Sequence, residues 1–129
     1  MSKKKGTRAE RELLHLLWNA NFATLRTAGS GSITIPSCDL LVGKKGKVFA
    51  IECKFIKDKI YILQDRIKEL KEFSRKFGAQ PLIGVKVMNK GWFFLELNKL
   101  EKSKGGNYIV SFDLAKRKGV ELKDFISKK

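Results

Sequence analysis

The sequence has very few of the residues from which histidine or cysteine metal centres are built. It contains one histidine, His15, and two cysteines, Cys38 and Cys53, in 129 residues. A single histidine excludes a multi-histidine metal centre. Two cysteines are too few for a secreted disulfide framework or a four-cysteine zinc site. Candidate metal ligands are therefore limited to carboxylates.

Long apolar segments and acidic residues are also scarce. No stretch approaches the ~20 apolar residues of a spanning helix, and the basic residues 3–5 are not followed by the apolar region of a secretory signal. We therefore expect a cytoplasmic protein with no membrane partner. Lys and Arg number 28 against 13 Asp and Glu, a net charge of +15, while 43% of residues are hydrophobic. These values predict one folded domain, residues 1–129, whose basic surface attracts polyanions such as nucleic acid.

Hydrophobic periodicity predicts an α/β domain with a mixed sheet. A capping box starts a helix at about residues 7–20, and an apolar stripe indicates a second helix at residues 63–77, ended by Gly78. Strands are predicted at residues 22–26, 39–42, 48–54, 81–87, 92–97 and 108–110, with short helical segments near Leu114 and Phe125.

The central hairpin brings two carboxylates together. If it turns at Lys45 and Gly46, positions pair outward from the turn, and Asp39 faces Glu52. Opposed Cβ atoms lie roughly 4.5–5.5 Å apart, so the two carboxylates repel unless a cation separates them. Lys54, two residues after Glu52, shares its face. Oxygen ligands suit Mg²⁺, with Mn²⁺ as a substitute, and the constellation indicates phosphodiester hydrolysis.

Simpler explanations exist for several of the polar residues that could form such a site. A Glu-x-Lys pair such as Glu52 and Lys54 is commonly a weak ion pair on a solvated strand face. Glu10 is fully explained as the fourth residue of the capping box. Ser30 and Ser32 fit an ordinary flexible loop. Spacing alone leaves these alternatives open.

Several motifs, in this order and spacing, resemble those of the archaeal Holliday junction resolvase family within the PD-(D/E)xK nuclease superfamily. They cover residues 5–6, 10–13 and 26–32, Asp39 with Glu52-Cys53-Lys54, residues 73–78, and Gly91-Trp92. The likeness runs from about residue 5 to residue 92. One position departs from the family pattern, because Cys38 stands where a proline usually precedes the metal-binding aspartate.

The resemblance implies a restriction-endonuclease-like αβββαβ core, with a centrally placed mixed sheet flanked by helices. It also assigns roles to residues. The implied metal ligands are Glu10, Asp39 and Glu52, with Lys54 stabilising the transition state and Ser30 acting in catalysis near the scissile phosphate. The implied DNA contacts are Arg11, Arg26, Ser30, Ser32 and Lys57.

The implied reaction is resolution of four-way DNA junctions by paired, symmetric nicks, which a homodimer can supply. The resemblance places the dimer interface at Phe73 and Phe77, although the helical stripe alone would make both residues core. Another repair or restriction-like nuclease, and a non-catalytic module that binds DNA architecture, remain as alternatives. A sliding clamp also stays open as a partner, but residues 122–126 carry no clear docking motif.

The same hairpin register predicts a second facing pair. Cys38 should face Cys53 on the side of the sheet away from the metal site, within the Cα distance that a disulfide can span. Because cytoplasmic thiols are normally kept reduced, we expect the two cysteines to be in contact as free thiols rather than bridged.

Overall fold

The structure, a computed structural model, describes residues 3–27 and 35–128. Its elements are α1 (Lys3–Asn19), β1 (Ala23–Arg26), β2 (Leu40–Lys44), β3 (Lys47–Ile56), β4 (Lys59–Ile62), α2 (Gln64–Phe77), β5 (Gln80–Val87), β6 (Gly91–Glu96), the 3₁₀ helix η2 (Leu97–Lys99), β7 (Glu101–Lys102), β8 (Tyr108–Ser111), α3 (Phe112–Lys118), β9 (Val120–Glu121) and α4 (Leu122–Lys128). The predicted αβββαβ order is confirmed, with the short strand β4 inserted before α2.

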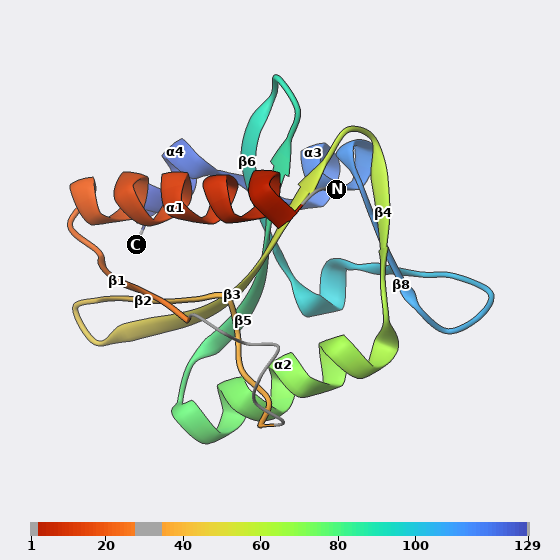
Figure 1. The fold of residues 1–129 in the computed structure, drawn as a ribbon, viewed down its shortest axis with the longest axis horizontal. Coiled ribbons are helices and arrows are strands. Elements are labelled where there is room, and N and C mark those ends of the chain that lie inside the picture. The colour runs from red at the N-terminus through yellow and green to blue at the C-terminus, as the bar shows by residue number, and fades with distance from the viewer. Residues whose placement is uncertain (1–2, 28–34, 129) are drawn as a thin grey trace.

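A six-stranded mixed sheet forms the centre of the molecule (Figure 1). Its strand order is β1-β2-β3-β5-β6-β9, and β3 pairs in parallel with β5 while the other neighbours are antiparallel. The crossover from β3 to β5 contains α2, as parallel pairing requires a long connection. This arrangement confirms the predicted α/β class and the central position of β3.

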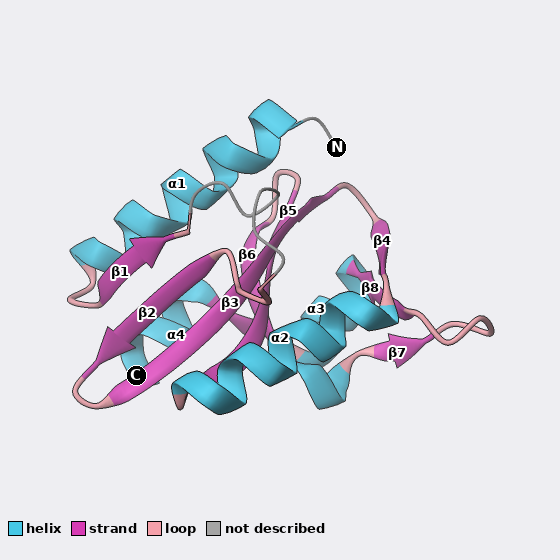
Figure 2. Cartoon of the chain, turned by 60° about the horizontal axis from the view of Figure 1, so that its bottom comes forward, coloured by secondary structure: helices cyan, strands magenta, loops and turns pink. Residues whose placement is uncertain are grey.

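Alternate side chains of β3 enter two separate cores. Phe49, Ile51 and Cys53 pack with buried residues of α1 and α4, whereas Ala50 and Ile56 pack with those of α2 and α3. Figure 2 shows α1 and α2 on opposite sides of the sheet. Because both faces are covered, β3 is buried along most of its length, and a polar side chain there needs partners.

The C-terminal part of the chain completes both cores. Strands β4, β8 and β7 form a second sheet whose buried Ile62 and Val110 join the core beneath α2. Phe125 of α4 stacks on Phe22 and Phe94, with ring centroids 5.6 and 4.5 Å apart. No helix within the described residues is long and apolar enough to cross a membrane.

The predicted hairpin register is confirmed from the turn to Leu40. Lys44 pairs with Lys47, and Leu40 pairs with Ile51. Lys45 and Gly46 have φ angles of 51° and 86°, the left-handed pair that a two-residue turn between twisted strands requires. The first helix starts at Lys3, four residues before the predicted start.

Gly84 provides a test of how tightly the sheet is packed. A Cβ at this position of β5 would lie 2.9 Å from Ile51 Cγ2 and 3.3 Å from Phe94 Cε1. We expect Gly84→Ala to lower the free energy of unfolding by about 1–3 kcal/mol, because a well-packed core does not accept an added methyl group. Urea denaturation measures the change. Gly43→Ala is the matched control, since its Cβ would meet no atom closer than 3.4 Å, and equal midpoints for the two variants would contradict the prediction.

Candidate active site

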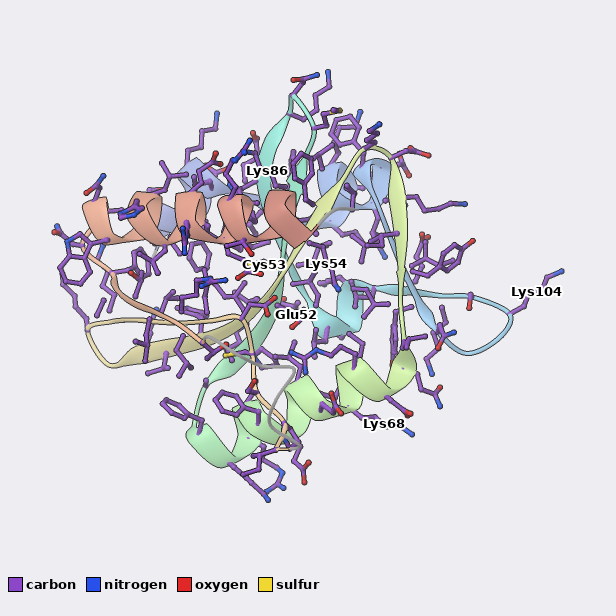
Figure 3. The ribbon with its side chains drawn as sticks, viewed as in Figure 1. Glu52, Cys53, Lys54, Lys68, Lys86 and Lys104 are labelled. Atoms are coloured by element: carbon purple, nitrogen blue, oxygen red, sulfur yellow. The ribbon has the colours of Figure 1, made fainter. Side chains whose placement is uncertain are left out.

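The candidate site lies on β3, between α1 and α2 (Figure 3). Glu52 is only 5% exposed, and Lys54 Nζ lies 3.6 Å from its Oε2 atom. The prediction that these two side chains share a face of β3 is therefore confirmed. A buried carboxylate at this position differs from the solvated ion pair that a Glu-x-Lys sequence commonly forms.

Asp39 reaches this region through a β-bulge. Its N–H donates to Ile51 O at 3.0 Å, although Ile51 is already the partner of Leu40. Two residues therefore oppose one, which bends the strand and re-aims a side chain. Asp39 is thus not directly opposite Glu52, and its Oδ2 instead accepts a hydrogen bond from the N–H of Cys53 at 2.8 Å.

The bulge also explains why the predicted pairing of the cysteines is wrong. Because of the extra residue, side chains before Leu40 point to the opposite face of the sheet from the one predicted. Cys38 therefore packs in the core beneath α2, while Cys53 packs in the core beneath α1. Both are buried free thiols, as expected. Burial, and then the charge of Asp39, raise the pKa of Cys38 to about 12, which keeps this thiol protonated and unreactive.

The carboxylates near Asp39 form one electrostatic group. Burial, followed by the charge of Glu52, raises the pKa of Asp39 to about 7, and the charge of Glu10 adds to the rise. The hydrogen bond from the Cys53 N–H opposes this shift. The acidic side chains are therefore close enough to disfavour one another's charge.

Arg66, which the sequence analysis did not single out, neutralises Glu52 from α2. Its Nη2 atom lies 2.5 Å from Glu52 Oε1 and 2.9 Å from Ser37 O, and Nη1 lies 3.2 Å from Glu69 Oε1. Burial alone would lower the pKa of Arg66, but its hydrogen bond to Glu52 and the charge of that residue raise it. The sequence feature that could have indicated Arg66 was its position as a basic residue at the edge of the apolar stripe of α2.

Glu10 has its own cationic partner. Arg26 Nε on β1 donates to Glu10 Oε1 at 2.9 Å, so this predicted DNA contact also orients a predicted metal ligand. Arg11 and Lys57 are exposed, as DNA contacts would need to be. Ser30 and Ser32 lie outside the described residues.

Glu12 fixes the position of α1 over the sheet, a role that the sequence analysis did not assign. It accepts hydrogen bonds from Lys86 Nζ at 2.7 Å and Trp92 Nε1 at 2.9 Å. Burial would raise the pKa of Glu12, but the hydrogen bonds from these two side chains lower it below its usual value. The helix that carries Glu10 is therefore tied to β5 and β6.

The acidic residues do not form a closed metal cage. Within residues 3–27 and 35–128, no three His, Cys, Asp or Glu side chains are gathered closely enough to hold a metal ion. Glu10 and Glu52 instead each contact an arginine. Metal binding by Glu10, Asp39 and Glu52 therefore stays a prediction.

The predicted interface residues differ in exposure. Phe77 is 53% exposed at the end of α2, whereas Phe73 is half-buried and packs against the core beneath this helix. Their rings stack with centroids 5.5 Å apart. Phe73 therefore contributes to the core as well as to the surface, and Phe77 is the residue that a monomer leaves uncovered.

The αβββαβ order around a mixed sheet, with Asp39, Glu52 and Lys54 near its centre, places the chain in the class of restriction-endonuclease-like folds. The model of the archaeal Holliday junction resolvase family (Hjc) matches residues 1–129. The chain belongs to this family.

Individual relatives agree with the family match. The crossover junction endodeoxyribonuclease Hjc of Archaeoglobus fulgidus is 40% identical over 102 residues, which are 78% of this chain and 75% of the relative. The protein of the same name from Sulfurisphaera tokodaii is 32% identical over 130 residues, covering 97% and 88%. The solved structure of A. fulgidus Hjc, described as a Holliday junction resolvase from an archaeal hyperthermophile, superimposes with a TM-score of 0.84 at 32% identity over 95% of this chain and 96% of that one.

The raised pKa of Asp39 predicts how stability depends on pH. Because the folded protein binds this proton more tightly than the unfolded chain, the free energy of unfolding should fall as pH rises from about 4 to 7. Asp39→Asn should remove this slope and stabilise the metal-free protein at pH 8 by about 1–4 kcal/mol. Thermal unfolding in EDTA across this pH range measures both effects. A wild-type slope that persists in the variant would contradict the assignment to Asp39.

Proposed function

We propose that this chain is a Mg²⁺-dependent endonuclease that resolves four-way DNA junctions by paired, symmetric nicks. The observation that carries the proposal is the buried Glu52 beside Lys54 and Asp39 on the central strand of a chain of this family. The curated relatives are named crossover junction endodeoxyribonucleases, which supports the same reaction here. The net charge of +15 suits a polyanionic substrate.

The chemistry of the donor set fits Mg²⁺, or Mn²⁺ in its place. Burial, followed by the negative charges of Glu52 and Glu10, raises the pKa of Asp39, so a bound cation would favour its charged form. Carboxylate oxygens are the ligands that these hard ions prefer. Glu10, Asp39 and Glu52 would hold the ion. When bound, such an ion acidifies a water molecule and neutralises charge on the phosphodiester in the transition state.

The side chains of the chain itself supply the remaining functions. Lys54, whose ammonium lies 3.6 Å from Glu52 Oε2, would orient the attacking water or stabilise the charge of the transition state. Arg11, Arg26 and Lys57 would contact the phosphates. We assign the same role to Ser30 and Ser32 on the family likeness alone. Phosphate contacts position the substrate without reading base sequence, as recognition of a junction by its shape requires.

A homodimer formed through α2 is part of this proposal. Two symmetric cuts need two identical sites, and a two-fold dimer provides them in a fixed geometry. The exposed ring of Phe77, stacked on Phe73, is the apolar contact available on this helix. We place the enzyme in the cytoplasm, as the sequence predicts.

A cleavage assay tests the proposed reaction. With Mg²⁺, the wild-type protein should cut a synthetic four-way junction at symmetric positions and leave linear duplex intact. Asp39→Asn should lower the rate by about 100- to 1000-fold, because it removes a preorganised charge from the site, while junction binding persists. Asp113→Asn, which removes an exposed carboxylate of α3, is the matched control.

Two results would count against the proposal. Equal cutting of linear duplex would favour another nuclease on the same fold. Junction binding without metal-dependent cutting would favour a non-catalytic DNA-architecture module.

The oligomeric state tests the proposed interface. Phe77→Asp should shift the protein from dimer to monomer in size-exclusion chromatography with light scattering, because a buried carboxylate is strongly unfavourable at an apolar contact. The half exposure of Phe77 means that the variant should still fold, which circular dichroism checks. Trp18→Asp, at a 60% exposed aromatic residue of α1, is the control. A dimeric Phe77→Asp protein would place the interface elsewhere.

A further inference from the structure

We propose that Arg66 is a positioning residue that fixes one carboxylate oxygen of Glu52 and so presents the other oxygen to the metal ion. The inference rests on the proposed function, because it assumes that Glu52 is a metal ligand. It assigns to α2 a direct part in preparing the site, in addition to its place in the core and at the proposed interface.

The contacts of Arg66 fix its guanidinium in one orientation. It meets three acceptors from different parts of the chain: Glu52 Oε1, Ser37 O and Glu69 Oε1. The donors of a guanidinium lie in one rigid plane, so simultaneous bonds to three acceptors determine both its position and its angle. A group held in this way can in turn hold the carboxylate that it contacts.

The contact with Glu52 involves only one of its two oxygens. Arg66 Nη2 lies 2.5 Å from Oε1, whereas the nearest cation to Oε2 is Lys54 Nζ at the longer distance of 3.6 Å. Asp39 also has one oxygen in close contact with the protein, because its Oδ2 accepts the hydrogen bond from the Cys53 N–H. Each carboxylate thus has one oxygen bound to the protein. Outer partners of this kind orient metal ligands and raise metal affinity.

The bond to Ser37 connects the two segments that carry the predicted ligands. Ser37 lies two residues before Asp39, and its carbonyl shares the Nη2 atom with Glu52. One nitrogen therefore ties the strand of Glu52 to the segment leading into the bulge. Neutralisation of Glu52 alone would not require this second acceptor, so the geometry favours positioning over a simple counterion.

The two roles predict opposite effects of removing Arg66 on metal binding. A simple counterion competes with the metal for Glu52, so its loss should strengthen binding. A positioning group prepares the ligand geometry, so its loss should weaken binding by about 10- to 100-fold. Lysine in place of Arg66 separates charge from geometry, since a single ammonium keeps the charge but does not reproduce the planar fork.

Binding of Mn²⁺ to the full chain without DNA tests the inference, followed by the electron paramagnetic resonance signal of free Mn²⁺. We expect Arg66→Met and Arg66→Lys both to bind about 10- to 100-fold more weakly than the wild type. Lys68→Met is the control, because Lys68 is an exposed cation of the same helix (Figure 3). Glu69→Gln keeps the bonds to Glu52 and Ser37 and should change affinity little. Arg66→Lys retains a positive charge beside Glu52, so its Mn²⁺ affinity still tests the inference if Arg66→Met does not fold.

Each other result contradicts a specific part of the argument. Tighter binding by Arg66→Met, or wild-type affinity in Arg66→Lys, would overturn positioning and leave the proposed metal site intact. A wild-type chain that binds no Mn²⁺ would overturn the metal site itself, and the role of Arg66 with it.

Discussion

The negative charge of Glu52, buried at the middle of the central strand, is the constraint on which the site depends. A carboxylate that is 5% exposed is strongly unfavourable unless cations and hydrogen bonds surround it. Lys54 contributes from the same strand, but its 3.6 Å distance makes it the weaker partner, and Arg66 at 2.5 Å contributes from α2. The helix must therefore pack with its first turn over β3, which also brings it over Ser37.

Much of this architecture could be predicted from the sequence because it is encoded locally. The side chains of β3 point alternately into two cores, so their positions repeat every two residues. Gly46 and Gly78 mark backbone positions with positive φ that few other residues accept. The register of the hairpin follows from its two-residue turn, so the predicted residue pairing is confirmed from Lys44 to Leu40. Glu52 and Lys54 were placed on one face by this local information alone.

The parts that could not be predicted depend on contacts between distant residues. The bulge at Asp39 exists because Ile51 O accepts an additional N–H, and no residue type in the sequence marks that event. It displaced Asp39 from its predicted partner and separated the two cysteines. The contact of Arg66 with Glu52 depends on how α2 packs, which the apolar stripe indicates only as a face and not as an atomic position.

Helix α2 connects the candidate site with the proposed interface. Arg66 lies in its first turn and Phe77 at its last residue, about 16 Å apart along a helix that rises 1.5 Å per residue. A helix is rigid over this length, and buried Ile67 and Leu70 fix it to the sheet. In a dimer formed at Phe77, the distance and angle between two Glu52 carboxylates would therefore be set by the fold rather than by the DNA. A substrate that is selected by the spacing of two phosphodiesters, and not by its base sequence, requires such rigidity.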